Sequence, residues 1–311
     1  MSAPQKFGPA ELARATGCSP AVAALAFDRL HPPELTYRPL TQAETAATIA
    51  DIETVIRDKP LRTVGDDDPA VWERGWAELA DQLASQTITT HTLRPQYYHG
   101  EVPCRLFGGL VEQVTPDFEY WVGLCVRFVT FAEFLRDQRD IVEFGCGTGI
   151  NLLLLAQLIP GARLAGCDWA TPSQRILAQI ARETGEAIEG YRFNMLSATG
   201  ECGPVGADTA VLTVHALEQV GAGWQPFLDF VIARRPRLCV HLEPLVELYE
   251  TAPLDDLARR YHRKRRYLDG FVPAIQALAA RGQAEILTLR RTAFSGLYQE
   301  AYSVLVWRPR V

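Results

Sequence analysis

The fold class is indicated most clearly by one stretch of the sequence, Ile141-Val142-Glu143-Phe144-Gly145-Cys146-Gly147-Thr148-Gly149-Ile150-Asn151-Leu152. A short apolar run ends in three alternating glycines, and a helical pattern begins directly after them. Glycine lets the backbone approach a ligand closely and turn where other residues cannot. The stretch therefore predicts a strand, a tight loop and a helix. Open α/β sheets bind their ligands at such a loop, at the carboxyl end of the strand.

From about residue 139 onward the chain alternates short apolar runs with helical stretches. The predicted strands are 141–144, 163–167, 190–193, 209–214 and 237–242, and the predicted helices are 150–158, 171–184, 223–234 and 254–281. This alternation is typical of a parallel sheet with helices on both faces. Two final strands, 284–290 and 301–307, have no helix between them and predict an antiparallel pair at one edge of the sheet.

The glycine spacing selects among the ligands that such loops bind. A dinucleotide-binding loop has the pattern G-x-G-x-x-G, whereas this loop has G-x-G-x-G, with Ile150 in the place of the third dinucleotide glycine. A phosphate-binding P-loop needs a lysine, which is absent here. Glu143 precedes the glycines and suits a cationic ligand better than a phosphate. S-adenosylmethionine, which carries an ammonium and a sulfonium, has that character.

The segment Glu-Phe-Gly-Cys-Gly-Thr-Gly at 143–149 resembles motif I of the class I S-adenosylmethionine-dependent methyltransferases. The resemblance covers residues 139–311. It implies a Rossmann-like, doubly wound α/β fold with a seven-stranded sheet whose last strand is antiparallel, and S-adenosylmethionine as the cofactor. Asp168 follows the second strand about 20 residues after the loop, which is the offset of a ribose-binding acid. The cofactor-binding candidates are Glu143, Gly145, Cys146, Gly147, Gly149, Asp168, Trp169, Asn194, Met195 and His215.

Three of these candidates have a second interpretation. Trp169 could line the adenine site or pack in the core. Asn194 stands where the family often has an acid, and it either accepts a hydrogen bond from the adenine or caps a turn. His215 follows the fourth strand and could act as a general base or serve only in packing.

The ends of the fourth and fifth strands predict the methyl-acceptor site. The catalytic candidates are His215, Glu243 and Tyr249. The candidates for binding the acceptor are Tyr97, Tyr98, Glu218, Glu243, Tyr249, His262 and Tyr298. Glu243 could alternatively be a charge at a helix start. The basic stretch 259–266 is interpreted as an exposed helix or as an anion contact.

Residues 1–135 form a separate region in this interpretation, and residues 136–311 form the methyltransferase domain. Apolar periodicity predicts helices at 10–15, 20–30, 41–57, 69–85 and 118–136. We expect a mostly helical N-terminal cap that shapes the acceptor pocket, with Tyr97 and Tyr98 in a loop that covers it.

Composition limits the partners. The 311 residues include 31 basic and 37 acidic side chains, a net charge of −6, which disfavours nucleic-acid binding. No apolar run reaches the roughly 20 residues of a membrane helix, and the N-terminus does not resemble a signal peptide, so we expect no membrane partner and a cytoplasmic protein. The seven cysteines are scattered without a CxxC pair and predict buried thiols, and no metal site is expected.

The expected reaction is methyl transfer to an oxygen or nitrogen atom of a polar small-molecule or peptide acceptor, in natural-product, glycan or modified-peptide biosynthesis. The oligomeric state is left open, a homodimer included. Two alternatives remain: a non-catalytic scaffold that binds S-adenosylmethionine, and a nicotinamide-dependent oxidoreductase on a related fold.

Overall fold

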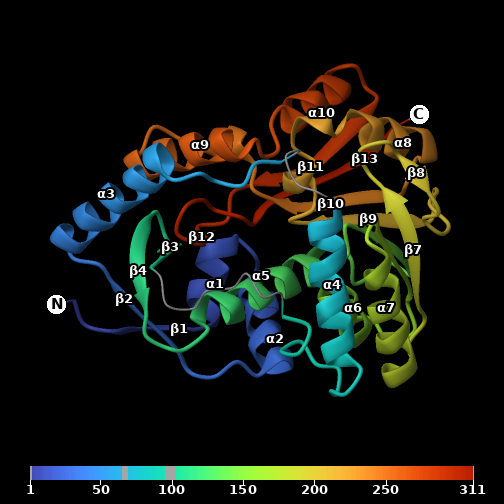
Figure 1. Cartoon of the computed structure of the whole chain (residues 1–311), viewed down its shortest axis with the longest axis horizontal. Coiled ribbons are helices and arrows are strands. Elements are labelled where there is room, and N and C mark those ends of the chain that lie inside the picture. Colours follow the sequence, from blue (N-terminus) through green and yellow to red (C-terminus); the bar gives the residue numbers. More distant parts are fainter. Residues whose placement is uncertain (1, 65–68, 95–102, 311) are drawn as a thin grey trace.

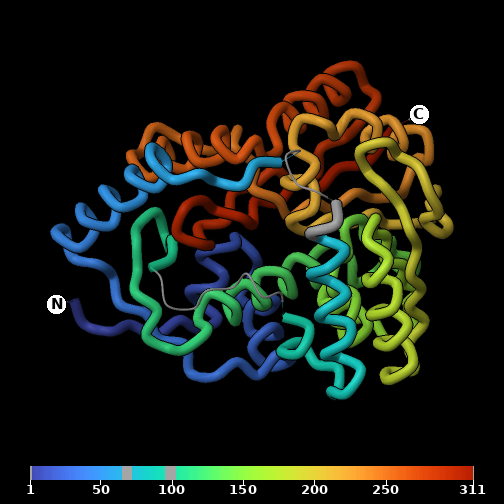
Figure 2. The backbone as a smooth tube through the Cα atoms, in the orientation of Figure 1, coloured from blue at the N-terminus to red at the C-terminus, as the bar shows by residue number. Residues whose placement is uncertain are grey.

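The computed structural model describes residues 2–64, 69–94 and 103–310 (Figure 1). These residues form two sheets, and Figure 2 shows the course of the whole backbone in the same orientation. The larger sheet has the strand order β11-β13-β10-β9-β5-β6-β7-β8. Its strands are β5 (Asp140–Phe144), β6 (Arg163–Asp168), β7 (Ile188–Asn194), β8 (Thr199–Gly200), β9 (Thr209–Val214), β10 (Leu238–Glu243), β11 (Ala284–Arg290) and β13 (Ser303–Pro309).

The predicted parallel sheet and its antiparallel edge are confirmed. Strands β7, β6, β5, β9 and β10 run parallel, whereas β13 pairs antiparallel with both β10 and β11. The expected count of seven strands is too low for this sheet by one. The additional strand β8 has two residues and pairs antiparallel with the end of β7, a pairing too short to leave an apolar pattern in the sequence.

Helices cover this sheet, and one of the predicted helices is divided. The helices of this part are α6 (Ile150–Leu158), α7 (Thr171–Thr184), α8 (Gln225–Arg234), α9 (Pro253–Arg265) and α10 (Phe271–Ala280). The single helix expected over 254–281 is wrong, because Arg266 and Gly270 adopt left-handed φ angles of 54° and 81° between α9 and α10. Such a conformation ends a helix, and glycine adopts it at little cost.

A second sheet, which the sequence did not predict, combines four strands of the first part of the chain with one strand near the C-terminus. Its order is β1-β2-β4-β3-β12, and its strands are β1 (Gln5–Phe7), β2 (Leu35–Pro39), β3 (Cys104–Leu106), β4 (Gly109–Gln113) and β12 (Phe294–Ser295). Each strand has two to five residues, too few for a periodic signal to emerge. The helices of this part are α1 (Pro9–Thr16), α2 (Pro20–Leu30), α3 (Gln42–Asp58), α4 (Pro69–Leu83) and α5 (Phe118–Phe134).

The hydrophobic core is continuous across residue 135. One cluster of buried side chains extends from Phe7 to Val306 and includes most of the apolar side chains of α5. Helix α5 is buried at most of its positions, because apolar side chains occupy most of its circumference. None of the helices in the described ranges combines the length and apolar character needed to cross a bilayer. The seven cysteines are buried with free thiols, as predicted.

Candidate functional site

The loop after β5 requires glycine at three alternating positions. Gly145, Gly147 and Gly149 have φ angles of 74°, 50° and 75°, which side chains disfavour. A Cβ atom on Gly145 would lie 2.3 Å from the Cβ atom of Ala216, and one on Gly149 would lie 2.5 Å from a methyl group of Leu177. The loop therefore needs glycine both for its turn and for its packing against the neighbouring segments.

Hydrogen bonds attach this loop to the end of β6. The backbone N–H of Cys146 donates to the carbonyl of Cys167 at 3.1 Å, and that of Gly147 donates to Oδ2 of Asp168 at 3.0 Å. Oδ1 of Asp168 accepts from the N–H of Ala170 at 2.9 Å, and burial raises the pKa of the carboxyl to about 6. A carboxylate offers about four lone pairs, so Asp168 retains acceptor capacity beyond these two bonds.

Buried polar atoms next to the loop have no hydrogen-bond partner among the described residues. They are Oε2 of Glu143, Oγ1 of Thr148 and Oδ1 of Asn151. Oε1 of Glu143 accepts from Nδ2 of Asn151 at 2.6 Å, and burial raises the pKa of Glu143 to about 8. Buried polar groups without partners are rare in proteins and often mark an absent ligand or water. The residues around the loop thus fit a polar ligand such as a nucleoside with an amino-acid group.

A tryptophan of the N-terminal part covers the loop. The indole ring of Trp76, on α4, lies 3.3 Å from the position that a Cβ atom on Gly147 would occupy. Helix α4 runs beside α7 (Figure 1), and Oε2 of Glu73 accepts from the N–H of Thr171 at 3.1 Å. Sequence reasoning missed this contact; the only signal was Trp72 and Trp76 one helical turn apart.

The remaining cofactor candidates lie near the same strand ends. The terminal methyl of Met195 is 3.4 Å from the Cβ position of Gly145. Oδ1 of Asn194 accepts from the N–H of Leu196 at 2.9 Å, so this side chain caps a turn, the second of its two interpretations. Trp169 is half-buried, and its carbonyl accepts from the guanidinium of Arg192 at 3.2 Å.

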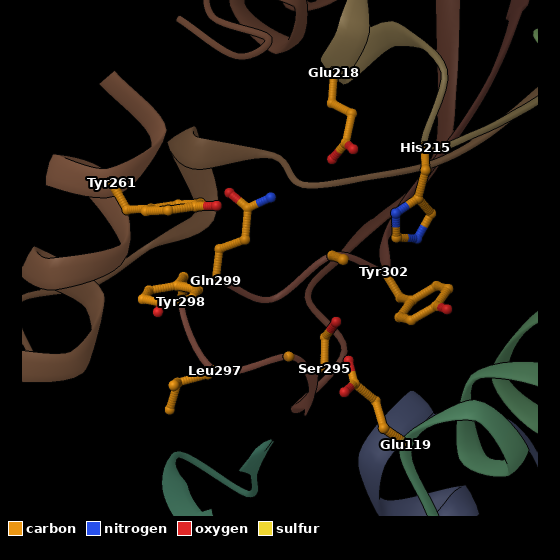
Figure 3. Close-up of a pocket in the computed structure, with 11 residues that line it drawn as sticks. Glu119, His215, Glu218, Tyr261, Ser295, Leu297, Tyr298, Gln299 and Tyr302 are labelled. Carbon is orange, nitrogen blue, oxygen red and sulfur yellow. The ribbon is translucent and has the colours of Figure 1, made fainter. Parts of the chain in front are cut away.

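A pocket of about 190 Å³ lies beside the end of β9 (Figure 3). Its lining residues are Glu119, His215, Glu218, Tyr261, Ser295, Gly296, Leu297, Tyr298, Gln299, Ala301 and Tyr302. Among the acceptor-site candidates, His215, Glu218 and Tyr298 are therefore brought together. Sequence reasoning missed Glu119 and Tyr302, because neither follows a parallel strand: Glu119 opens α5 and Tyr302 precedes β13.

His215 is held in an unusual conformation at this pocket. Its φ angle is 54°, and its N–H donates to the carbonyl of Leu242 at 3.0 Å. The imidazole meets the ring of Tyr302 edge-on at 4.5 Å, and Nε2 is buried without a partner among the described residues. Burial and the nearby guanidinium of Arg127 lower the pKa of His215 to about 3. The imidazole is therefore neutral near pH 7 and offers both a donor and an acceptor nitrogen.

Two carboxyl groups of the pocket titrate close to neutral pH. Burial, followed by the proximity of Glu243, raises the pKa of Glu218 to about 8. Burial raises the pKa of Glu119 to about 7. A general base works best when its pKa lies near the operating pH. These carboxyl groups therefore suit proton transfer better than His215, which sequence reasoning favoured.

Glu243 is placed below the pocket and does not line it. Its Oε1 accepts from the N–H groups of Ala216 and Leu217 at 3.0 and 3.1 Å, and its Oε2 accepts from the N–H of Glu218 at 3.2 Å. The side chain is fully buried, and burial raises its pKa to about 7. Glu243 thus positions the segment 215–218 from beneath, instead of facing an acceptor as expected.

Tyr249 and His262 also lie outside the lining. The hydroxyl of Tyr249 accepts from the N–H of Glu300 at 3.0 Å and lies 3.3 Å from the carbonyl of the same residue. The imidazole of His262 contacts the carbonyl of Leu268, and its Nδ1 is 3.4 Å from Oε1 of Gln299, a residue that does line the pocket. Both expected ligand-binding side chains therefore support the walls from behind. Tyr97 and Tyr98 lie outside the described residues.

The basic stretch 259–266 forms contacts with the N-terminal part of the chain. Nζ of Lys264 donates to the carbonyls of Ile56 and Lys59, at the end of α3. The N–H of Val64, which follows α3, donates to the carbonyl of Arg265 at 2.9 Å. This stretch therefore helps to attach α9 to α3, a role that neither sequence interpretation included.

Comparison with known proteins adds evidence on the fold. No protein-family model matches the chain, and no curated protein matches its sequence. Among solved structures, the [4+2]-cyclase SpnF matches 81% of this chain and 98% of its own, with 14% identity and a TM-score of 0.51. Magnesium protoporphyrin IX methyltransferase (ChlM) from Synechocystis PCC 6803 with bound SAM matches 76% of this chain and 97% of its own, with 14% identity and a TM-score of 0.45.

The pyocyanin biosynthetic protein PhzM matches 64% of this chain at 16% identity and a TM-score of 0.45, and the match spans only 60% of PhzM. At such identities the likeness concerns the fold alone. The antiparallel last strand and the glycine loop at the end of β5 are the features that the sequence resemblance implied. The chain has the fold of the class I S-adenosylmethionine-dependent methyltransferases.

Proposed function

We propose that this protein is an S-adenosylmethionine-dependent methyltransferase that methylates an oxygen or nitrogen atom of a polar acceptor bound beside His215. One observation carries the proposal. Ala216 packs against Gly145 of the glycine loop, while His215 and Glu218, on either side of it in the chain, line the pocket. Cofactor loop and acceptor pocket therefore share one short segment, the arrangement that a transfer between two bound molecules requires.

The chain offers matching groups for each part of the cofactor. The glycine loop would lie along the nucleoside, and Asp168 would accept from the ribose hydroxyls. The unpartnered atoms of Glu143, Thr148 and Asn151 supply polar capacity around the loop, directly or through water. When bound, the cofactor supplies an electrophilic methyl group on a sulfonium.

The pocket residues would orient the acceptor and remove its proton. An acceptor hydroxyl or ammonium must lose a proton so that its lone pair can attack. Glu218 and Glu119, with pKa values of about 8 and 7, can take up that proton near neutral pH. The neutral imidazole of His215 can hold the acceptor through Nε2. Glu243 acts through the backbone that it holds and is a positioning residue.

The wider setting is proposed on composition and on the pocket. A small pocket lined by acidic and aromatic side chains, on a chain of net charge −6, suits a small molecule or a peptide side chain better than a nucleic acid. We place the protein in the cytoplasm, where seven buried free thiols remain reduced. Natural-product, glycan or modified-peptide biosynthesis supplies acceptors of this kind.

Calorimetric titration with S-adenosylhomocysteine, and separately with NADH, tests the cofactor assignment. We expect the first to bind and the second not to bind. Asp168→Ala should weaken binding by about 10- to 100-fold, because charge-assisted hydrogen bonds contribute about 1.5–3 kcal/mol. The matched variant Asp229→Ala, on α8, should leave the affinity unchanged. Binding of NADH, or an unaltered affinity in Asp168→Ala, would contradict the assignment.

A further inference from the structure

The pocket beside His215 holds two acidic side chains that approach from opposite sides. Glu119 enters from the first turn of α5, and Glu218 enters from the short helix η1 (Leu217–Gln219). Figure 3 shows the Glu218 carboxyl directed into the pocket from one side and the Glu119 carboxyl rising from the other. No Lys or Arg side chain is among the described residues that line the pocket.

The Glu218 carboxyl has unused hydrogen-bonding capacity inside the pocket. The residue is only 9% exposed, and its Oε1 accepts from the amide of Gln219 at 2.9 Å. Its Oε2 is buried and has no partner among the described residues. An unsatisfied buried carboxyl is costly, and a carboxylate can only accept hydrogen bonds. The group that satisfies the ionised form is therefore a donor, and a positively charged donor also lowers the pKa of the carboxyl and so favours that form.

Aromatic rings form much of the remaining wall. Tyr261 and Tyr298 stack at 4.8 Å with an angle of 12° between their planes, and Tyr302 lies edge-on to His215. Aromatic rings attract cations through their negative faces, and they pack well against the carbon atoms of an organic amine. Acidic groups and aromatic rings in one pocket thus favour the same ligand charge.

Several cationic side chains lie close to this pocket. The guanidinium of Arg127 lies 5.6 Å from the ring centre of Tyr302 and acts on His215, and Arg105 donates to the carbonyls of Leu297 and Tyr298. Arg265 donates to the hydroxyl of Tyr261, and Arg94 forms an ion pair with Asp117 at 2.6 Å. Both guanidinium groups favour the ionised form of their neighbouring pocket carboxyl, yet burial dominates and the pKa of each carboxyl is raised. The neighbouring guanidinium groups therefore do not offset the cost of ionising these two carboxyls.

We propose that the acceptor is an amine, which binds as its ammonium ion between Glu119 and Glu218 against the tyrosine rings. This inference rests on the proposed methyltransferase function and narrows its acceptor to nitrogen. The single positive charge of the ammonium lies between the two carboxyl groups and favours the ionised form of each. The pocket, with a volume of about 190 Å³, holds roughly six water molecules and admits a small amine or the end of a longer one.

Methyl transfer to the amine needs only Glu218, the bound amine and the proposed cofactor to balance its protons and electrons. The ionised carboxylate of Glu218 takes one proton from the ammonium, which leaves a neutral amine with a free lone pair. That lone pair forms the new nitrogen–carbon bond as the carbon–sulfur bond breaks, and the electron pair of the broken bond stays on sulfur. The positive charge of the sulfonium passes to the methylated ammonium, and the proton on Glu218 is then released to solvent.

Three probes of similar shape test the charge preference. We would titrate 2-phenylethylamine, 2-phenylethanol and 3-phenylpropionate by calorimetry into the full-length protein saturated with S-adenosylhomocysteine at pH 7. The amine should bind at least about tenfold more tightly than the alcohol, and the carboxylate most weakly. Equal affinity for amine and alcohol, or no binding of the amine, would overturn the proposal.

Glu218→Gln and Glu119→Gln assign the preference to the two carboxyls. Each should weaken amine binding about tenfold and leave the affinity for S-adenosylhomocysteine within about twofold, which also shows that the variant is folded. Glu250→Gln is the matched control, since Glu250 is exposed and outside the lining. Amine binding that is unaffected in both pocket variants would refute the assignment.

Proton exchange gives a second signature of the ion pair. An arriving ammonium favours ionised carboxylates, so binding at pH 7 should release protons from Glu218 and Glu119 into the buffer. At pH 9 both groups are already ionised, and the release should nearly vanish. Calorimetry in buffers of different ionisation enthalpy measures it, and the absence of release at pH 7 would contradict the proposal. Failure of S-adenosylhomocysteine to bind wild-type protein would instead overturn the proposed function.

Discussion

The Glu243 carboxylate binds the backbone of the segment that carries His215 and Glu218. It accepts three consecutive N–H groups within 3.0–3.2 Å, at a position without solvent exposure. A strand-end glutamate in this fold suggested an acceptor contact, because residue type and position are visible in a sequence. The sequence does not show where its carboxyl group points, because that depends on the backbone of residues 216–218, which folds next to the end of the strand.

Replacement of this residue should loosen the segment. In Glu243→Gln only one side-chain oxygen remains to accept from the three N–H groups. We expect faster amide hydrogen exchange over residues 215–219 and a free energy of unfolding lower by about 1–3 kcal/mol at pH 8. Exchange mass spectrometry and urea denaturation measure the two effects, with Glu250→Gln as control. Unchanged protection of the segment would show that other contacts hold it.

At the scale of elements, the sequence predicted those with strong periodicity and missed the short ones. Strands β5, β6 and β9 are buried through nearly all their length and left apolar runs that could be read directly. Strands β1 to β4 have three to five residues and exist because they pair with each other and with β12, almost 190 positions beyond β3. Such pairing leaves no local pattern.

The candidate site divides in the same way. The loop 145–149, Asp168, His215 and Glu218 follow strands of one parallel sheet, so their meeting at one edge could be predicted. Glu119, Tyr302 and Trp76 reach the same edge from elements whose packing the sequence does not reveal.

The position of helix α4 beside the glycine loop leads to a prediction about the rate of cofactor binding. Its Trp76 packs over Gly147 of the glycine loop. We expect this ring to move when the proposed cofactor binds. We expect Trp76→Ala to accelerate association of S-adenosylhomocysteine by about tenfold or more, because the barrier of displacing a packed indole disappears. Stopped-flow fluorescence measures the association rate constant. Glu78→Ala, at an exposed position of the same helix, is the matched control, and equal rates in all three proteins would contradict the prediction.

At the scale of the whole molecule, buried carboxyls link stability to pH. Burial raises the pKa of Glu143 and Glu218 to about 8, far above their ordinary value in the unfolded chain. The folded state therefore binds more protons, and its stability falls as pH rises through 8. Burial lowers the pKa of His215, so its effect on the pH dependence of stability is opposite in sign. That effect is confined to pH values below about 7 and does not contribute near pH 8. Buried cysteines add to the loss at higher pH.

We expect the Tm of the ligand-free protein to fall by about 5 °C between pH 7 and 8.5, the size expected when two carboxyls ionise at a cost. Differential scanning fluorimetry across this range measures it. Glu143→Gln should flatten the dependence, whereas Glu250→Gln should keep it. A Tm that is constant or rises over this window would contradict the raised pKa values.

A buried arginine ties the two parts of the chain together. Arg105, on β3, is 2% exposed, and its guanidinium donates to the carbonyls of Leu254, Leu297 and Tyr298 at 2.9–3.1 Å. Strand β12 of the C-terminal part pairs directly with β3, and one core cluster spans both parts. Side chains from both sides of the expected boundary at residue 135 therefore pack in one core. The sequence suggested two units because its pattern changes there from helical to alternating strands and helices.

The two parts should therefore unfold together. In urea, tryptophan fluorescence and far-UV circular dichroism should report one coincident transition, because neither part retains a closed core without the other. Arg105→Met should lower the free energy of unfolding by about 2–4 kcal/mol, since three buried carbonyls lose their donors, and should shift both signals equally. Residues 136–311 expressed alone should lack a cooperative transition, because the apolar face that α5 covers would be exposed. A folded fragment that binds S-adenosylhomocysteine would instead establish an independent domain and make the N-terminal part an accessory to it.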